Sequence, residues 1–562
     1  MMLKDSISTG SSAAAGSRLR GARLVRWLLL GLAAALFALH FLHLKADFPN
    51  DSPWMDWSKY TDEGWYGDAA IRHFLFGHWY FKGDFNPAVA LPVWPLLEAL
   101  VFRFTGVSVV AARALTLCVF GAMLGALYLL IDRFPRLEHG PGEVSLAAPL
   151  AVFLFCASPF FYVFERMAIL EPLLATLTTV AILVASCVQP WERRPAALRE
   201  WVRLLWPLVA LGLLLPAMVL TKTTAAALVP AVGYMLWYRA GYRLRPALKL
   251  ALLPLALAAM IWAGYLLLFV RPHYLEDYQY LFSANAYTGF QLQPLATVLF
   301  NTFADGHWMG GVLYPAFFVA VVLALFARPA FFRDPLVPTL LLWTGGYFAF
   351  LAYHNNLQPR YYLVPAVPIT ALVALALEEF RHAPARISRH SVRALWPLVA
   401  AAVVAAIAVP DVLLQLSFIL HPEYTFENAA QNIARIVRSN PQQPDLILSI
   451  SGSDLTLMTG LPSIDDDFGT LDLDQRVKQY HPGWYVAWNE LDDDKMDALR
   501  PLYRPVRVAE FPSMDDPERN LLILYRLDPN NSPGPLRQRR VRTPRPLRTR
   551  LGQQPTTTQL EH

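Results

Sequence analysis

Long apolar runs dominate this chain of 562 residues, and eleven of them approach the length needed to cross a lipid bilayer. A helix needs about 20 apolar residues to span a hydrocarbon core of roughly 30 Å. Charged residues make up only 16% of the chain, against roughly 25% in average proteins. The composition therefore excludes an ordinary soluble protein and predicts an α-helical polytopic membrane protein. The runs lie near 27–44, 107–131, 146–164, 167–188, 205–220, 223–238, 248–270, 308–327, 336–353, 361–377 and 394–415.

The first apolar run follows a basic segment that contains Arg18, Arg20, Arg23 and Arg26. A cleaved signal peptide has a similar charged start, but it ends in a cleavage site of small residues. No cleavage pattern of small residues follows His40-Phe41-Leu42-His43, near the end of this run. We therefore expect a retained first span, preceded by a basic cytoplasmic tail over residues 1–26.

Basic residues concentrate in alternate loops, and this alternation predicts the orientation of the chain. Cytoplasmic loops retain Lys and Arg close to the membrane ends. The loops after the second, fourth, sixth, eighth and tenth runs are basic, whereas the opposite loops are acidic. The pattern predicts a multi-pass protein of the inner (cytoplasmic) membrane with a cytoplasmic N-terminus. An odd number of spans then places residues after 420 on the extracytoplasmic face.

Two outer parts of the chain are large enough to carry function. The first outer loop, 45–106, has an amphipathic helical pattern at 62–76 and a second apolar piece at 92–104, and we expect both along the membrane interface. Residues 420–530 carry 19 acidic and 10 basic residues, with short strand-like segments, which predicts a small soluble α/β domain. The Pro- and Arg-rich segment 531–562 is typical of a disordered tail.

Adjacent carboxylates, Asp62 and Glu63, follow the first span in the outer loop. Ionisable groups at membrane level are costly, so they indicate function. One interpretation makes Asp62 a general base that takes a proton from an acceptor while Glu63 orients that acceptor. The alternative is that Asp62 only caps the helix that begins near Glu63.

Three cations, Arg166, Lys222 and Arg360, would emerge at the same outer face as Asp62. Guanidinium and ammonium groups bind phosphate, so together they predict a site for a phosphate ester. Separately, Arg166 is also compatible with an ion pair to Glu165, and Lys222 with a side chain that only reaches toward water. We predict substrate contacts from residues near these charges, namely Tyr66, His354, Tyr361 and Tyr362.

No metal site is predicted. The cysteines Cys118, Cys156 and Cys187 all lie in apolar runs, without metal-ligand spacing. The acidic runs 465–467 and 492–494 are better explained as solvated turns than as cation sites. Basic and acidic residues are concentrated in different parts of the chain. This distribution does not indicate one basic surface that would bind nucleic acid.

The chain resembles the GT-C superfamily of polytopic glycosyltransferases, in particular the protein O-mannosyltransferase and aminoarabinose-transferase branch. The resemblance covers about residues 27–380. Four stretches carry it: Thr61-Asp62-Glu63-Gly64-Trp65-Tyr66, Glu165-Arg166-Met167-Ala168-Ile169-Leu170-Glu171-Pro172, Leu220-Thr221-Lys222-Thr223 and Gln358-Pro359-Arg360-Tyr361-Tyr362-Leu363-Val364-Pro365. The acidic pair is the most specific of these, and the others are short.

The resemblance implies an inverting transfer of a sugar from a polyprenyl-phosphate donor, with no required cofactor and a divalent cation at most optional. It implies Asp62 as base, Glu63 as its acidic neighbour, and donor-phosphate binding by Arg166, Lys222 and Arg360. The lysine-proline-proline signature of aminoarabinose transferases is absent, because the first loop reads Asn86-Pro87-Ala88-Val89-Ala90-Leu91-Pro92. The sugar and the acceptor therefore stay open.

Two other functions are compatible with a polytopic chain. A transporter or flippase of lipid-linked glycans should have charged or broken-helix sites near the bilayer midplane. A scaffold that only presents residues 420–530 would leave the cations at membrane level without a purpose. The clustering of polar residues at one face favours the enzyme.

Overall fold

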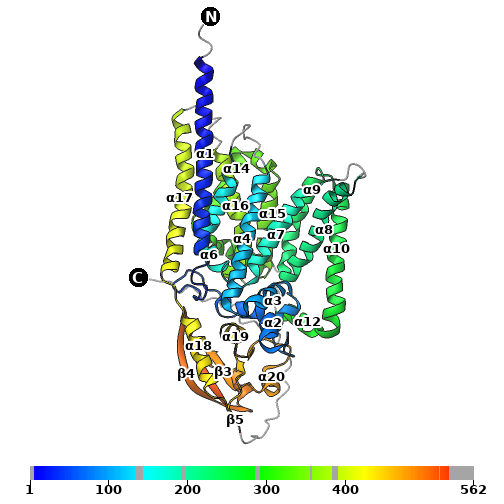
Figure 1. The fold of residues 1–562 in the computed structure, drawn as a ribbon, viewed down its shortest axis with the longest axis vertical. Helices are drawn as coiled ribbons and strands as arrows, with labels where there is room; N and C mark the ends of the chain where they lie inside the picture. The colour runs from blue at the N-terminus through cyan, green and yellow to red at the C-terminus, as the bar shows by residue number, and fades with distance from the viewer. Residues whose placement is uncertain are drawn as a thin grey trace.

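The computed structural model describes residues 6–134, 144–190, 197–284, 292–354, 357–381, 390–517 and 519–530. A bundle of long helices forms one end of the molecule, and a small domain with a β-sheet forms the other (Figure 1). The N-terminus lies at the end of the bundle that is remote from the sheet domain. The tail predicted to be disordered, 531–562, lies outside the described residues.

Among the described residues, eight helical segments are long and apolar enough to cross a membrane, and a ninth is present if one bent pair is a single span. The helices of the bundle are α1 (Ser6–Leu39), α4 (Val109–Arg133), α5 (Ala147–Ala157), α6 (Pro159–Phe164), α7 (Leu170–Cys187), α8 (Leu198–Thr221), α9 (Val229–Arg239), α10 (Leu244–Tyr265), α14 (Leu313–Ala327), α15 (Leu336–His354), α16 (Leu363–Arg381) and α17 (His390–Leu420). The predicted class of a polytopic helical membrane protein is confirmed.

Three of the eleven expected spans are interrupted in the structure. The run 146–164 is divided into α5 and α6 at Ser158, whose side chain accepts a hydrogen bond from the N–H of Phe161, before Pro159. The run 223–238 begins with a 3-10 segment, η3 (Thr223–Leu228). The chain before α14 bends by 112° at a break that includes Gly310, which has a φ of 140°. Helix α1 also begins at Ser6, within the segment expected as a tail.

The first outer loop forms two short helices beneath the bundle. A 3-10 turn, η1 (Trp57–Tyr60), leads into α2 (Asp62–Phe76), and η2 (Pro87–Val89) leads into α3 (Val93–Thr105). The two expected helices of this loop are therefore present. The later outer loop contributes α12 (Leu275–Ala284) and α13 (Leu292–Asp305).

The C-terminal domain contains a five-stranded sheet in the order β2-β1-β3-β5-β4. The neighbours of β1 are parallel to it, while β5 is antiparallel to β3 and to β4. Helix α18 buries one apolar face, which includes Phe426, Ile433 and Val437. The elements are α18 (Thr425–Arg438), β1 (Ile447–Leu448), α19 (Gly452–Thr459), β2 (Ser463–Ile464), α20 (Leu473–Tyr480), β3 (Trp484–Trp488), α21 (Asp493–Leu499), β4 (Tyr503–Asp516) and β5 (Arg519–Pro529).

Helix α2 packs between α3 and the C-terminal domain. A Cβ at Gly64 would lie 2.2 Å from the main-chain nitrogen of Asp454 on α19, and a Cβ at Gly67 would lie 2.3 Å from Oε2 of Glu98 on α3. Glycine is therefore required at position 64, where the neighbour is main chain, whereas at position 67 a larger residue would have to displace the Glu98 carboxylate. The expectation of a helix lying freely on the membrane interface needs correction, because α2 is covered by protein on two sides.

Candidate functional site

A cavity with about 1150 Å³ of empty space, part of it open to solvent, lies where α2 meets the ends of membrane helices. The structure brings six of the predicted site residues to its wall: Asp62, Tyr66, Lys222, His354, Arg360 and Tyr361. They come from α2, from the turn after α8, from the end of α15 and from the chain that leads into α16. Segments far apart in the sequence therefore converge on one space.

Asp62 is the first residue of α2 and is 1% exposed. Its Oδ1 accepts a hydrogen bond of 2.9 Å from the Thr61 hydroxyl, and its Oδ2 lies 3.1 Å from Nε of Arg360. Thr61 occupies the N-cap position, so the interpretation of Asp62 as the helix cap is wrong. The carboxylate instead faces a cation at the wall of the cavity.

The environment of Asp62 favours its protonated form. Burial raises the pKa of this carboxyl, Arg360 acts in the opposite direction, and the nearby Asp56 raises it again. A raised pKa makes the Asp62 carboxylate a stronger base than an ordinary aspartate carboxylate.

Arg360 is held by Asp56 as well as by Asp62. The Arg360 main-chain N–H donates to Oδ2 of Asp56 over 2.8 Å, and its guanidinium forms an ion pair with Oδ1. Asp56 also caps η1 by accepting a hydrogen bond from the N–H of Ser58. One aspartate thus connects the first outer loop to the start of the span that carries Arg360.

Lys222 forms a buried ion pair with Glu171 at the first turn of α7. Its Nζ also lies 4.4 Å from the centre of the Tyr361 ring, and the guanidinium carbon of Arg360 lies 4.8 Å from the same ring. The attraction between cations and an aromatic face holds all three side chains at one wall. Glu171 thus holds Lys222 at the wall of the cavity.

Glu63 points away from the cavity. Arg113 on α4 donates to both of its carboxylate oxygens, over 2.8 and 2.5 Å, and the N–H of Ala168 donates to Oε1 over 2.9 Å. Arg113 also donates to the carbonyls of Leu44 and Ala46. Glu63 therefore holds α2 against α4 and the chain at Ala168, and this geometry does not support contact with an acceptor in the cavity.

Two further predicted residues lie outside the cavity. Arg166 donates to the carbonyls of Leu42 and His43 and stacks on the Tyr162 ring at 4.4 Å. It lines a separate hollow near the end of α17, and its expected ion pair with Glu165 is not formed among the described residues. The Tyr362 hydroxyl donates to the carbonyl of Thr302, which directs it into the protein core.

The structure adds residues that the sequence did not indicate as parts of the site. Asp56 was one of several acidic residues in the outer loops, without a distinguishing feature. Arg113 does carry a signal, because an arginine inside an expected span is costly. Phe468 reaches the cavity from the C-terminal domain, and its position depends on tertiary packing.

Within the described ranges, no group of three or more His, Cys, Asp or Glu side chains is arranged to hold a metal ion. In the run 465–467, Asp465 accepts hydrogen bonds from the N–H groups of Asp467 and Phe468. Asp466 accepts one from the Tyr485 hydroxyl and pairs with Lys495. These carboxylates therefore stabilise the fold, and the absence of a required metal stays a prediction.

Comparison with known proteins identifies the architecture. No protein-family model and no curated protein sequence matches the chain. Among solved structures, ArnT from Cupriavidus metallidurans in the apo state has a TM-score of 0.55 at 17% identity, covering 89% of this chain and 98% of ArnT. The same enzyme bound to undecaprenyl phosphate has a TM-score of 0.53 at 18% identity, covering 88% and 97%.

An oligosaccharyltransferase from Archaeoglobus fulgidus, in complex with zinc and sulfate, also resembles the chain. Its TM-score is 0.50 at 13% identity, and the match covers 89% of this chain and 73% of the archaeal one. Both neighbours are membrane glycosyltransferases of the GT-C superfamily. The helical bundle with its small C-terminal sheet domain therefore shares its fold with ArnT and with this oligosaccharyltransferase.

Proposed function

We propose that this protein transfers a sugar from a polyprenyl-phosphate donor to an acceptor on the extracytoplasmic face of the inner membrane. The observation that carries the proposal is the cavity lined by Asp62, by its ion-pair partner Arg360 and by Lys222. The shared fold supports it, because ArnT of the same fold has been crystallised with undecaprenyl phosphate.

The charges of the cavity suit a displacement at the anomeric carbon of the sugar. An acceptor hydroxyl or amine forms a bond to this carbon and passes its proton to Asp62. The bond to the phosphate oxygen breaks, and its electron pair stays with the leaving phosphate. Lys222 and Arg360 stabilise that negative charge. Attack opposite the leaving group inverts the configuration at the anomeric carbon.

The two cations of the cavity differ in how firmly they are already bound. Arg360 is engaged by Asp56 and Asp62, so it is fixed in position before the donor arrives. Among the residues that the structure describes, Lys222 pairs with one carboxylate, that of Glu171, and an ammonium group has three donors. Lys222 is therefore the group best able to form new hydrogen bonds to a phosphate.

The arrangement of the chain agrees with an outer site. The first outer loop and the C-terminal domain meet at one end of the bundle, opposite the N-terminus (Figure 1). If the basic N-terminal segment is cytoplasmic, the cavity opens toward the extracytoplasmic side. A donor with a membrane-embedded chain would then approach along the helices.

The proposal is tested by the products formed in proteoliposomes supplied with an undecaprenyl-phosphate hexose or pentose and a cell-envelope extract. A transferase yields bare undecaprenyl phosphate and a glycosylated product. A flippase moves the intact sugar lipid to the other leaflet without producing bare undecaprenyl phosphate, and that result would overturn the proposal.

A further inference from the structure

The C-terminal domain contributes an aromatic side chain to the cavity. Phe468, in the loop between β2 and α20, lines the cavity together with Trp65 of α2 and Phe85 of the first outer loop. The Trp65 ring lies edge-on to both phenylalanines, with ring centres 5.1 Å from Phe85 and 5.4 Å from Phe468. The Phe85 and Phe468 ring centres are 5.3 Å apart. We call these three residues the aromatic wall.

Hydrogen bonds from several neighbouring residues hold the loop that carries Phe468 in place. Asp465 accepts a hydrogen bond of 2.7 Å from the Phe468 N–H, and the Arg476 guanidinium donates to the Phe468 carbonyl. The next residue, Gly469, has a φ of +153°, and its N–H donates to the Tyr280 hydroxyl of α12. The position of the Phe468 ring is therefore set by contacts to both parts of the molecule.

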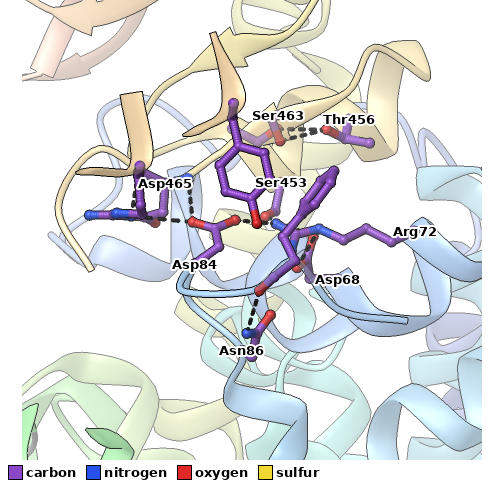
Figure 2. Close-up of polar contacts among 12 residues, drawn as sticks. Asp68, Arg72, Asp84, Asn86, Ser453, Thr456, Ser463 and Asp465 are labelled. Atoms are coloured by element: carbon purple, nitrogen blue, oxygen red, sulfur yellow. Dashed lines mark hydrogen bonds and ion pairs between the residues drawn. The ribbon is translucent and has the colours of Figure 1, made fainter. Parts of the chain in front are cut away.

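A buried polar network joins this loop to α2, as Figure 2 shows. Asp84 accepts from the N–H of Asp465 over 2.9 Å and pairs with Arg72 over 2.6 Å. Arg72 also pairs with Asp68 one turn earlier on α2, and Asp68 accepts from the Ser453 hydroxyl of α19. Charged hydrogen bonds of this kind hold the C-terminal domain in register with α2.

The aromatic wall is open to a ligand. All three of its residues are half-buried, so part of each ring faces accessible space. Within the described chain, the Trp65 indole N–H has no acceptor and the Gln358 side-chain oxygen has no donor, although both residues line the cavity. A buried polar group without a partner is costly. A hydroxyl-bearing ring satisfies both, since a hydroxyl donates and accepts.

We propose that the aromatic wall binds the transferred sugar ring, and that Phe468 is a specificity-determining residue supplied by the C-terminal domain. The inference rests on the proposed function. The cations lie at one wall of the cavity, and Trp65 follows Asp62 by three positions on α2. A sugar whose phosphate contacts Lys222 and Arg360 extends from Asp62 toward Trp65. The C–H face of a pyranose ring packs well on an aromatic surface.

The test compares the affinity of the purified full-length protein for bare undecaprenyl phosphate and for undecaprenyl phosphate that carries glucose, mannose or arabinose. We expect the wild type to bind at least one sugar-bearing lipid about tenfold more tightly than the bare lipid. In Phe468→Ala this preference should fall to about twofold or less, with affinity for the bare lipid unchanged. Phe468→Trp should retain it, whereas Phe468→Leu should not, because only the former keeps a flat ring.

Phe511→Ala is the matched control, because it removes an aromatic ring from the same domain outside the cavity. It should leave the preference unchanged, and the thermal unfolding of each variant verifies that it is folded. A wild type without preference for any sugar-bearing lipid overturns the inference, and so does full preference in Phe468→Ala. A wild type that binds no polyprenyl phosphate at all overturns the proposed function itself.

Discussion

Asp62 and Glu63 are adjacent in the sequence, but the structure gives their carboxylates different surroundings. Asp62 faces the cavity and Arg360, whereas both oxygens of Glu63 are occupied by Arg113. Successive helix residues point about 100° apart, so an adjacent pair on α2 cannot serve one site equally. The sequence marks the pair as important, but only the partners on α4 and before α16 separate the two roles.

At Lys222, phosphate binding can be separated from folding. Replacing Lys222 alone would leave Glu171 buried without its partner. The double substitution Lys222→Gln with Glu171→Gln removes both charges and should retain the fold. Losing a charge-assisted contact of about 1.5–3 kcal/mol should weaken undecaprenyl phosphate binding roughly 10- to 100-fold. Equilibrium binding checks this, with Asp493→Asn, an exposed site in the C-terminal domain, as control. Unchanged affinity in the double variant would remove Lys222 from the donor site.

Asp68 makes the stability of the junction between α2 and α19 depend on pH. Burial raises its pKa from 3.8 to about 7, although Arg72 acts in the opposite direction. Between about pH 4 and 7 the folded state holds a proton that the unfolded chain has lost. The contribution of Asp68 to the free energy of unfolding is fully present below this pH window and is lost as pH rises through it. Each unit of difference between the folded and unfolded pKa corresponds to roughly 1.4 kcal/mol.

The substitution Asp68→Asn removes this titration. Thermal unfolding at pH 5 and pH 8 should show a smaller loss of Tm for the variant than for the wild type. An equal or larger loss in the variant would show that Asp68 does not titrate in this window.

At the scale of elements, α2 is the part of the chain on which the site depends. Its first turn carries Asp62, its next turn carries Tyr66, and its two glycines at 64 and 67 allow contact with α19 and α3. The sequence predicts this helix from its amphipathic pattern. Its burial could not be predicted, because the partners that cover it lie in distant parts of the chain.

The Glu63–Arg113 pair should stabilise the position of α2. Glu63→Gln leaves the Arg113 guanidinium buried without its acid, and breaking such a buried pair typically costs 3–5 kcal/mol. We expect a clearly lower Tm for this variant. Combining Glu63→Gln with Arg113→Met removes the unpaired charge and should recover most of the loss. A single variant as stable as the wild type would contradict the structural role of the pair.

For the whole molecule, the sequence is sufficient to predict a helical bundle with a C-terminal α/β domain. Hydropathy could not show that the runs at 146–164 and 223–238 are interrupted, because their breaks at Ser158 and Thr223 depend on local backbone geometry. The convergence of Asp62, Lys222 and Arg360 could be predicted from their common membrane level. The absence of Arg166 from the cavity could not be predicted, because it depends on the direction in which the Arg166 side chain points.

The orientation of the chain can be tested with thiol labelling. In a variant whose native cysteines are replaced by alanine, a cysteine at Val508 on the exposed side of β4 should react with a membrane-impermeant maleimide in intact spheroplasts. A cysteine at Ser11 in the basic N-terminal segment should react only after permeabilisation. The reverse pattern would place the cavity on the cytoplasmic face.

The most direct test of the central claim is the turnover of an undecaprenyl-phosphate sugar by wild type and Asp62→Asn in proteoliposomes. A general base contributes typically 10²- to 10⁴-fold, so the variant should lose about that much turnover. Its affinity for bare undecaprenyl phosphate should stay within about twofold of the wild type, because the phosphate is assigned to Lys222 and Arg360. Undiminished turnover in Asp62→Asn would contradict the account.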